Sequence, residues 1–176
     1  MNIKQLGFIG IGLLIATALF TFAKLNHASA TKVDGTMFQD WKVTCKPADE
    51  KAKTPETCLI NQQVNSTVDG KQQPVALYQF GYFGPKKELQ FIQLLPLGVR
   101  LDAGTSIVSS KKLIAPSKYI TCTATGCEAA APISDADLKT LLSNTENAVA
   151  FMGIDGQVSN LLLSTKGLSE ALHYIK

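Results

Sequence analysis

The sequence predicts a mainly β protein, a β-sandwich or barrel with one or two short helices and two disulfides. From Phe38 onward, short segments with alternating apolar and polar residues are separated by turns rich in Gly, Pro and Asp. Helical spacing of apolar residues occurs in only two places, both after residue 133. Many short strands at this spacing are typical of a sandwich or barrel with minor helices.

Residues 1–30 have the pattern of a cleavable signal peptide. Lys4 precedes an apolar stretch from Leu6 to Phe22, and Ala28-Ser29-Ala30 is a small-x-small cleavage site. An uncleaved membrane anchor is the alternative, but the apolar stretch is short for a spanning helix. The sequence therefore predicts export to the periplasm, the outer surface or the medium, with no stable membrane span after cleavage.

Residues 31–176 are expected to form a single domain. Without the first 30 of the 176 residues, 146 remain, and they carry 15 of the 17 Lys and Arg and all 14 Asp and Glu. A chain of this length can bury about 70% of its unfolded surface. The near balance of charge excludes nucleic-acid binding based on overall charge.

Ten segments have strand character, and two have helical character. The expected strands are Phe38–Cys45, Cys58–Val64, Pro74–Phe83, Glu88–Leu95, Val99–Leu101, Thr105–Ser109, Lys118–Thr123, Cys127–Ala131, Ala148–Met152 and Val158–Ser164. Asp69-Gly70 predicts a tight hairpin turn between the second and third of them.

The first expected helix is Asp135–Ser143, because Ser134 followed by Asp137 resembles a capping box. The second is Gly167–Ile175, in which the apolar residues share one side; they are Leu168, Ala171, Leu172 and Ile175.

The four cysteines, Cys45, Cys58, Cys122 and Cys127, all follow the predicted signal peptide. An even number in an exported chain predicts two disulfides, and four cysteines allow three pairings. We favour Cys45–Cys58 and Cys122–Cys127, because each pair flanks an expected hairpin connection and closes a short loop. A zinc site is the alternative, but the spacing fits no common zinc-binding pattern. No C-x-x-C motif indicates a redox pair.

Histidine content argues against most hydrolytic mechanisms. Removal of the leader takes away His27 and leaves His173, which falls within an expected helix. No G-x-S-x-G or H-E-x-x-H motif is present. Asp135 and Asp137 fall at an expected helix start, where negative charge is stabilising. We therefore predict no catalytic, cofactor-binding or metal-binding residues, no cofactor and no enzyme activity.

The alternating aromatic residues Tyr78, Phe80 and Tyr82 would lie on one face of a strand. Such a stripe can be an exposed binding surface, but half of a sandwich core is the favoured interpretation. The doublets Lys86-Lys87 and Lys111-Lys112 could contact acidic headgroups, although solvated turns explain them more simply.

Four ordered stretches resemble the invasion-associated locus B family of exported bacterial proteins. They are Phe38–Cys45, Leu94–Gly104, Tyr119–Cys127 and Ser164–Leu172. The resemblance implies an immunoglobulin-like β-sandwich, secreted or surface-associated, linked in pathogens to entry into host cells. The family offers no established catalytic residues to carry over.

The leading functional hypothesis is a non-enzymatic interaction protein of the bacterial envelope or surface. Loops on a rigid scaffold, such as Lys46–Thr57 and Gly84–Glu88, would contact an envelope or host-surface protein. The alternative is a periplasmic small-ligand-binding protein or a carboxylate-based envelope enzyme, because two distant carboxylates leave no signature in a sequence.

Overall fold

The structure is a computed structural model that describes residues 32–68 and 70–176. The predicted signal peptide, residues 1–30, and the hairpin residue Asp69 lie outside the described residues. The strands are β1 (Met37–Phe38), β2 (Trp41–Lys46), β3 (Thr57–Val68), β4 (Lys71–Phe83), β5 (Glu88–Leu95), β6 (Thr105–Ser109), β7 (Lys112–Thr123), β8 (Gly126–Pro132), β9 (Asn147–Met152) and β10 (Val158–Leu162). The α-helices are α1 (Asp135–Leu142) and α2 (Leu168–Ile175), and a 3-10 turn, η1, covers Leu101–Ala103.

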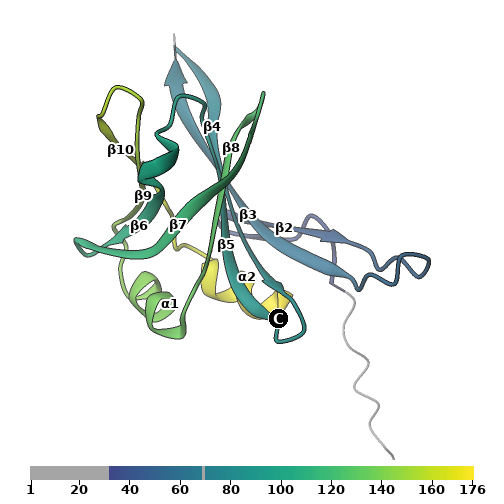
Figure 1. The fold of residues 1–176 in the computed structure, drawn as a ribbon. Coiled ribbons are helices and arrows are strands. Elements are labelled where there is room, and N and C mark those ends of the chain that lie inside the picture. The colour runs from purple at the N-terminus through teal and green to yellow at the C-terminus, as the bar shows by residue number, and fades with distance from the viewer. Residues whose placement is uncertain (1–31, 69) are drawn as a thin grey trace, which may run out of the picture. The chain divides into compact units, whose positions relative to one another are not determined.

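The ten strands form one antiparallel sheet in the order β1-β2-β3-β4-β5-β8-β7-β6-β9-β10 (Figure 1). The mainly β class, the two short helices and the two disulfides are therefore confirmed. The immunoglobulin-like arrangement that the family resemblance implies stays a prediction. The predicted strand Val99–Leu101 is replaced by a single bridge, Val99 to Gly153, followed by η1.

Strand β7 lies between two groups of strands, which we call the two halves of the sheet: β1–β5 with β8 on one side, and β6, β9 and β10 on the other. It connects the two halves by changing its partner halfway along its length. Its first half pairs with β6, up to Ser117, and its second half pairs with β8 from Lys118 onward. The register with β6 shifts next to Pro116, where Ala115 has a φ of 49°. Proline cannot donate a ladder hydrogen bond, so a bulge at this point is expected. The strand predicted from Lys118 consequently begins earlier, at Lys112.

Aromatic side chains from β2, β4 and β5 form the centre of the core. Trp41, Tyr78, Phe80 and Phe91 are all 0% exposed. The ring centroid of Phe80 lies 5.5 Å from that of Trp41 and 4.7 Å from that of Phe91, within the range of favourable aromatic pairs. The core interpretation of the predicted aromatic stripe is correct for Tyr78 and Phe80, whereas Tyr82 is only half-buried at the end of β4.

Helix α2 contacts β1, β2, β3 and β4. The four apolar residues that the sequence places on one side are all buried in this contact: Leu168, Ala171, Leu172 and Ile175. Gly167 precedes the helix with a φ of 76°, and a Cβ atom there would overlap the carbonyl oxygen of Phe38. Only glycine fits this combination of left-handed backbone and close approach.

Helix α1 begins as the sequence predicts and ends at Leu142. Ser134 is the N-cap, and its Oγ accepts a hydrogen bond of 3.1 Å from the Asp137 N–H. The Ser134 hydroxyl in turn donates to the Asp137 carboxylate at 2.7 Å. The Ser134 side chain thus satisfies one of the backbone donors that a helix start leaves unpaired.

A buried hydrogen-bond network crosses the interior between the two halves of the sheet. The amide Nε2 of Gln93 on β5 donates to Ser117 Oγ on β7 at 2.8 Å. Its Oε1 accepts from Thr105 Oγ1 on β6 at 2.6 Å. All three residues are at most 5% exposed, so these hydrogen bonds satisfy polar groups that solvent does not reach.

We expect Gln93→Leu to lower the free energy of unfolding by about 1–3 kcal/mol, because the Thr105 hydroxyl is left buried without its acceptor. Gln90→Leu is the matched control. Gln90 lies on the opposite face of the same strand and makes no side-chain hydrogen bond among the described residues. Urea unfolding followed by circular dichroism measures both variants, and equal midpoints would contradict the role assigned to Gln93.

Candidate functional site

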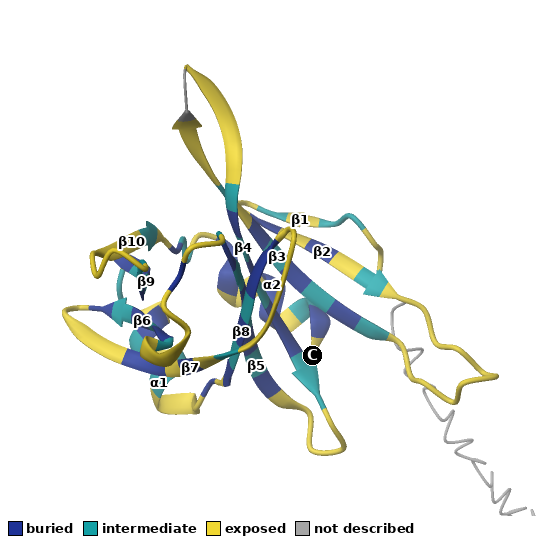
Figure 2. Cartoon of the chain, turned by 45° about the horizontal axis from the view of Figure 1, so that its top comes forward, coloured by how far each residue is buried: buried dark blue, intermediate teal, exposed yellow. Residues whose placement is uncertain are grey.

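The two loops that the sequence singles out lie at the same end of the sheet. Strand β2 ends at Lys46, which pairs with Thr57, and β4 ends at Phe83, which pairs with Glu88. Because β3 is antiparallel to both β2 and β4, the connections 47–56 and 84–87 leave the sheet at the same end (Figure 1). Both connections are exposed along their whole length (Figure 2).

Two adjoining depressions lie at this end of the sheet, and we call them together the loop-end site. The smaller, of about 240 Å³, lies between the two loops and the last residues of α2. The larger, of about 830 Å³, lies between the 84–87 turn and the start of α1. Tyr82, Lys87 and Lys176 line both depressions.

Charges of both signs surround the larger depression. Lys86, Lys87 and Lys176 supply the cations, and Glu88 and Asp135 supply exposed carboxylates. In the described part of the chain, the one ion pair within 4.0 Å joins Arg100 to Asp102, outside the loop-end site. The charged groups of this site are therefore available to pair with groups on another molecule.

Tyr82 places a phenol between the two depressions. Burial raises the pKa of Tyr82, and the nearby carboxylate of Asp135 raises it further. Both effects disfavour the phenolate form. The hydroxyl therefore stays protonated at neutral pH and can donate a hydrogen bond to a partner.

Of the two carboxylates considered for acid–base chemistry, Asp137 has a structural role. Asp135 and Asp137 lie in the first turn of α1, and Asp137 is bonded to the N-cap residue Ser134. His173 is exposed on α2 and lies outside both depressions.

All four cysteines form disulfides, in the favoured pairing. Cys45 is joined to Cys58 and Cys122 to Cys127, and each pair lies directly opposite in neighbouring strands. Among the described residues, one group of potential metal ligands is close enough to share an ion: Cys45, Glu56 and Cys58. Its two sulfur atoms are bonded to each other, so they cannot act as the thiolates that zinc requires.

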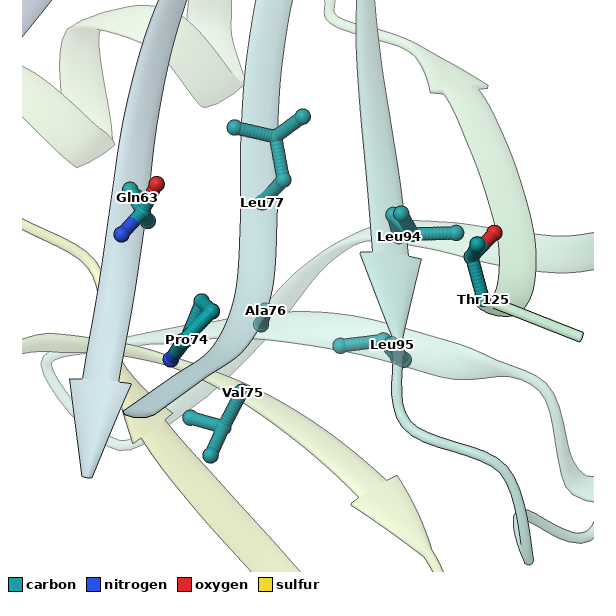
Figure 3. A pocket seen from close by; sticks show the side chains of 8 residues that line it. All are labelled: Gln63, Pro74, Val75, Ala76, Leu77, Leu94, Leu95 and Thr125. Atoms are coloured by element: carbon teal, nitrogen blue, oxygen red, sulfur yellow. The ribbon is translucent and has the colours of Figure 1, made fainter. Parts of the chain in front are cut away.

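The sequence did not reveal a largely apolar groove of about 230 Å³ beside β4 and β5 (Figure 3). Leu77 and Leu94, a directly paired couple on β4 and β5, form part of its lining. Gln63 and the turn residue Thr125 lie on either side of this couple (Figure 3). The available signal was an apolar residue at an outward position of each strand, which simple alternation assigns to solvent.

The fold and these surfaces define a small, disulfide-bonded, antiparallel β domain with an exposed charged end. Within it, no helix among the described residues has the length and apolar character needed to cross a membrane. The family model described as "Invasion associated locus B (IalB) protein" matches residues 41–176. The chain belongs to this family, as the resemblance in the sequence indicated.

A solved structure supports the fold. The crystal structure of invasion associated protein B from Bartonella henselae aligns with 80% of this chain and 94% of its own chain, with a TM-score of 0.65. The two sequences are 15% identical, so the likeness concerns the fold. A search of curated proteins found no match.

The two disulfides are expected to contribute unequally to stability. Replacing Cys45 and Cys58 by Ala removes a bridge with a sequence separation of 13 and should cost about 3 kcal/mol in the chain-entropy model. Replacing Cys122 and Cys127 removes a separation of 5 and should cost about 2 kcal/mol. Urea unfolding without reductant measures both, and a larger loss for the second pair would contradict this ranking.

We expect Asp135→Asn to lower the pKa of Tyr82 without restoring its usual value of 10.0, because burial persists. Carbon-13 NMR of labelled tyrosine rings follows the titration, with Asp155→Asn on the β9–β10 turn as the control. Since the folded state holds the phenol proton more tightly, the free energy of unfolding should fall as the pH rises above 10.0. An unchanged titration in Asp135→Asn would exclude the electrostatic contribution.

Proposed function

We propose that this protein is an exported, non-enzymatic interaction protein of the bacterial envelope or surface. Membership of the invasion-associated locus B family supports a role at this location. Two disulfides in a chain of this size support an oxidising compartment. In this proposal residues 1–30 are removed as a signal peptide, and residues 31–176 function as one domain.

The observation that carries the proposal is that both loops begin at the loop-end site, where Pro55 and Glu56 of one loop and Gly84 and Lys87 of the other line the smaller depression. The Cys45–Cys58 disulfide joins the two strands at the base of the 47–56 loop. Packed strands hold the ends of the 84–87 turn, since Phe83 pairs with Glu88. Exposed loops on a rigid scaffold are the usual position of partner-binding residues.

The charges of the loop-end site indicate the kind of partner surface. A protein with interspersed acidic and basic groups would complement the cations Lys86 and Lys87 and the carboxylates of Glu88 and Asp135. Complementary charges increase the association rate and make it depend on salt. An envelope or host-surface protein is the proposed partner, and the linkage to invasion is proposed through the family.

A small-ligand-binding function is the second candidate, and the apolar groove favours it. The groove has a floor of Leu77 and Leu94 and two polar side chains at its sides, Gln63 and Thr125 (Figure 3). Ligand pockets commonly combine apolar walls with a few polar groups. A thermal-shift screen with envelope metabolites and glycans distinguishes the candidates, since a saturable rise in Tm that Leu94→Glu abolishes would favour the groove.

The double variant Lys86→Glu/Lys87→Glu should reduce partner capture about tenfold while the Tm stays unchanged, because both side chains are exposed and unpaired. Capture is measured by crosslinking the purified domain to envelope extracts and to host-cell membranes. Lys111→Glu/Lys112→Glu, in the β6–β7 turn and at the first residue of β7, changes the charge equally away from the site and is the control. Equal capture by the two variants, or none by the wild-type domain, would contradict the proposal.

A further inference from the structure

Strand β10 is the last strand of the sheet, and among the described residues it pairs with β9 alone. The backbone bonds Gly153 N–H to Gln157 O and Leu163 N–H to Asn147 O, of 2.8 and 2.9 Å, belong to this pairing. Along an antiparallel pair of strands, residues that are hydrogen-bonded to the partner strand alternate with residues that are not. Ser159 and Leu161 therefore bond to β9, whereas the backbone groups of the alternate residues point away from the sheet: Val158, Asn160 and Leu162.

This outward edge has no partner in the described part of the chain. No turn, loop or side-chain hydrogen bond reaches the backbone of Val158, Asn160 or Leu162 there. Val158 is 59% and Leu162 65% exposed, and the segment 156–165 contains no charged residue and no proline. Natural sheets usually protect an edge with charges, proline or a covering segment.

The other end of the sheet shows such protection. There the edge of β2 is covered by the preceding segment, because Val43 N–H donates to Thr36 O at 2.8 Å. The Cys45 N–H donates to the Asp34 carboxylate at 2.9 Å. The open edge of β10 is therefore a particular property of that strand.

A groove of about 330 Å³ is lined by Leu162 and Ser164, by residues 62–65 of β3 and by Asp40. The carboxylate of Asp40 accepts a hydrogen bond from the Ser164 hydroxyl. Residues 62–65 of β3 pair with β4 on one side, whereas β2 pairs with β3 only as far as Asn61. Beyond Asn61, the edge of β3 that faces away from β4 therefore has no strand partner in the described part of the chain. One end of the groove is closed at Ser164, whose N–H donates to Gln62 Oε1 at 3.0 Å. The Ser164 carbonyl accepts from Trp41 Nε1 at 3.1 Å.

We propose that an extended, uncharged segment of a partner protein binds to β10 as an added strand. Unpaired N–H and C=O groups along a strand edge are satisfied by the backbone of another strand. The side chains of the added strand that face Val158 and Leu162 would be apolar. A groove between two strands that is closed at one end admits a single extended chain more readily than a second folded domain. This surface is separate from the loop-end site and goes beyond the proposed function.

The probe is a set of dodecapeptides selected from a random display library on the folded domain and then synthesised. We expect selected peptides to have apolar residues at alternate positions. On binding, amide hydrogen exchange should slow at Val158, Asn160 and Leu162. Exchange at Ser159 and Leu161, already bonded to β9, should change little. Protection confined to other parts of the chain, or a library that yields no binder, would overturn the proposal.

Asn160→Pro tests the same contact, because it removes one outward N–H and no bond of the β9–β10 pair. Affinity for the peptides should fall at least about tenfold, whereas Asn160→Ala, the matched control, should stay within about twofold. If Asn160→Pro does not fold, peptides N-methylated at alternate amides provide the same test on the wild-type domain and should lose binding.

Two further outcomes would overturn the proposal. One is equal peptide affinity in Asn160→Pro and Asn160→Ala. The other is a wild-type dimer, seen by sedimentation, in which the amides of Val158, Asn160 and Leu162 are protected without peptide, since the occupant would then be a second copy of this chain.

Discussion

The hydrogen bonds of Gln93 hold the two halves of the sheet together near the place where β7 changes its partner. Gln93 belongs to β5, and its two partners, Ser117 and Thr105, belong to β7 and β6. A strand that passes from one half of a sheet to the other needs a bend, and the bulge beside Pro116 supplies it. A fully satisfied polar network in the core then favours one particular arrangement of the halves, because any other leaves buried groups unpaired. The aromatic cluster around Phe80 supplies burial, but burial alone is not directional.

The disulfides act at the ends of the strands, away from this network. Cys45–Cys58 holds the base of the long 47–56 loop, and Cys122–Cys127 holds the end of the β7–β8 hairpin. The loop-end site depends on the first of these bridges and on α2, whose last residues line its smaller depression. Packing of α2 depends in turn on Gly167, where any side chain would collide with Phe38. The proposed binding surface thus depends on residues from both termini of the domain.

Two surfaces of this domain have different chemistry. The loop-end site has unpaired charges of both signs, so association there should depend on salt. The edge of β10 is uncharged and offers backbone groups, so binding there should depend on the conformation of the partner more than on its charge. One domain can therefore contact a folded partner at its loops and an extended segment at its edge.

The sequence by itself determined the mainly β class, the positions of most strands, both helices and the presence of two disulfides. These follow from local patterns: alternation along β2, the Ser134 cap, the apolar side of α2 and an even cysteine count. Local patterns could not show that β7 continues through Pro116, because a proline ends a strand unless a neighbouring register shift accommodates it. The order of the strands, the meeting of two loops at one end and the unpaired edge of β10 were decided only by the tertiary structure. Each depends on which strands become neighbours, and that is set by contacts between residues far apart in the chain.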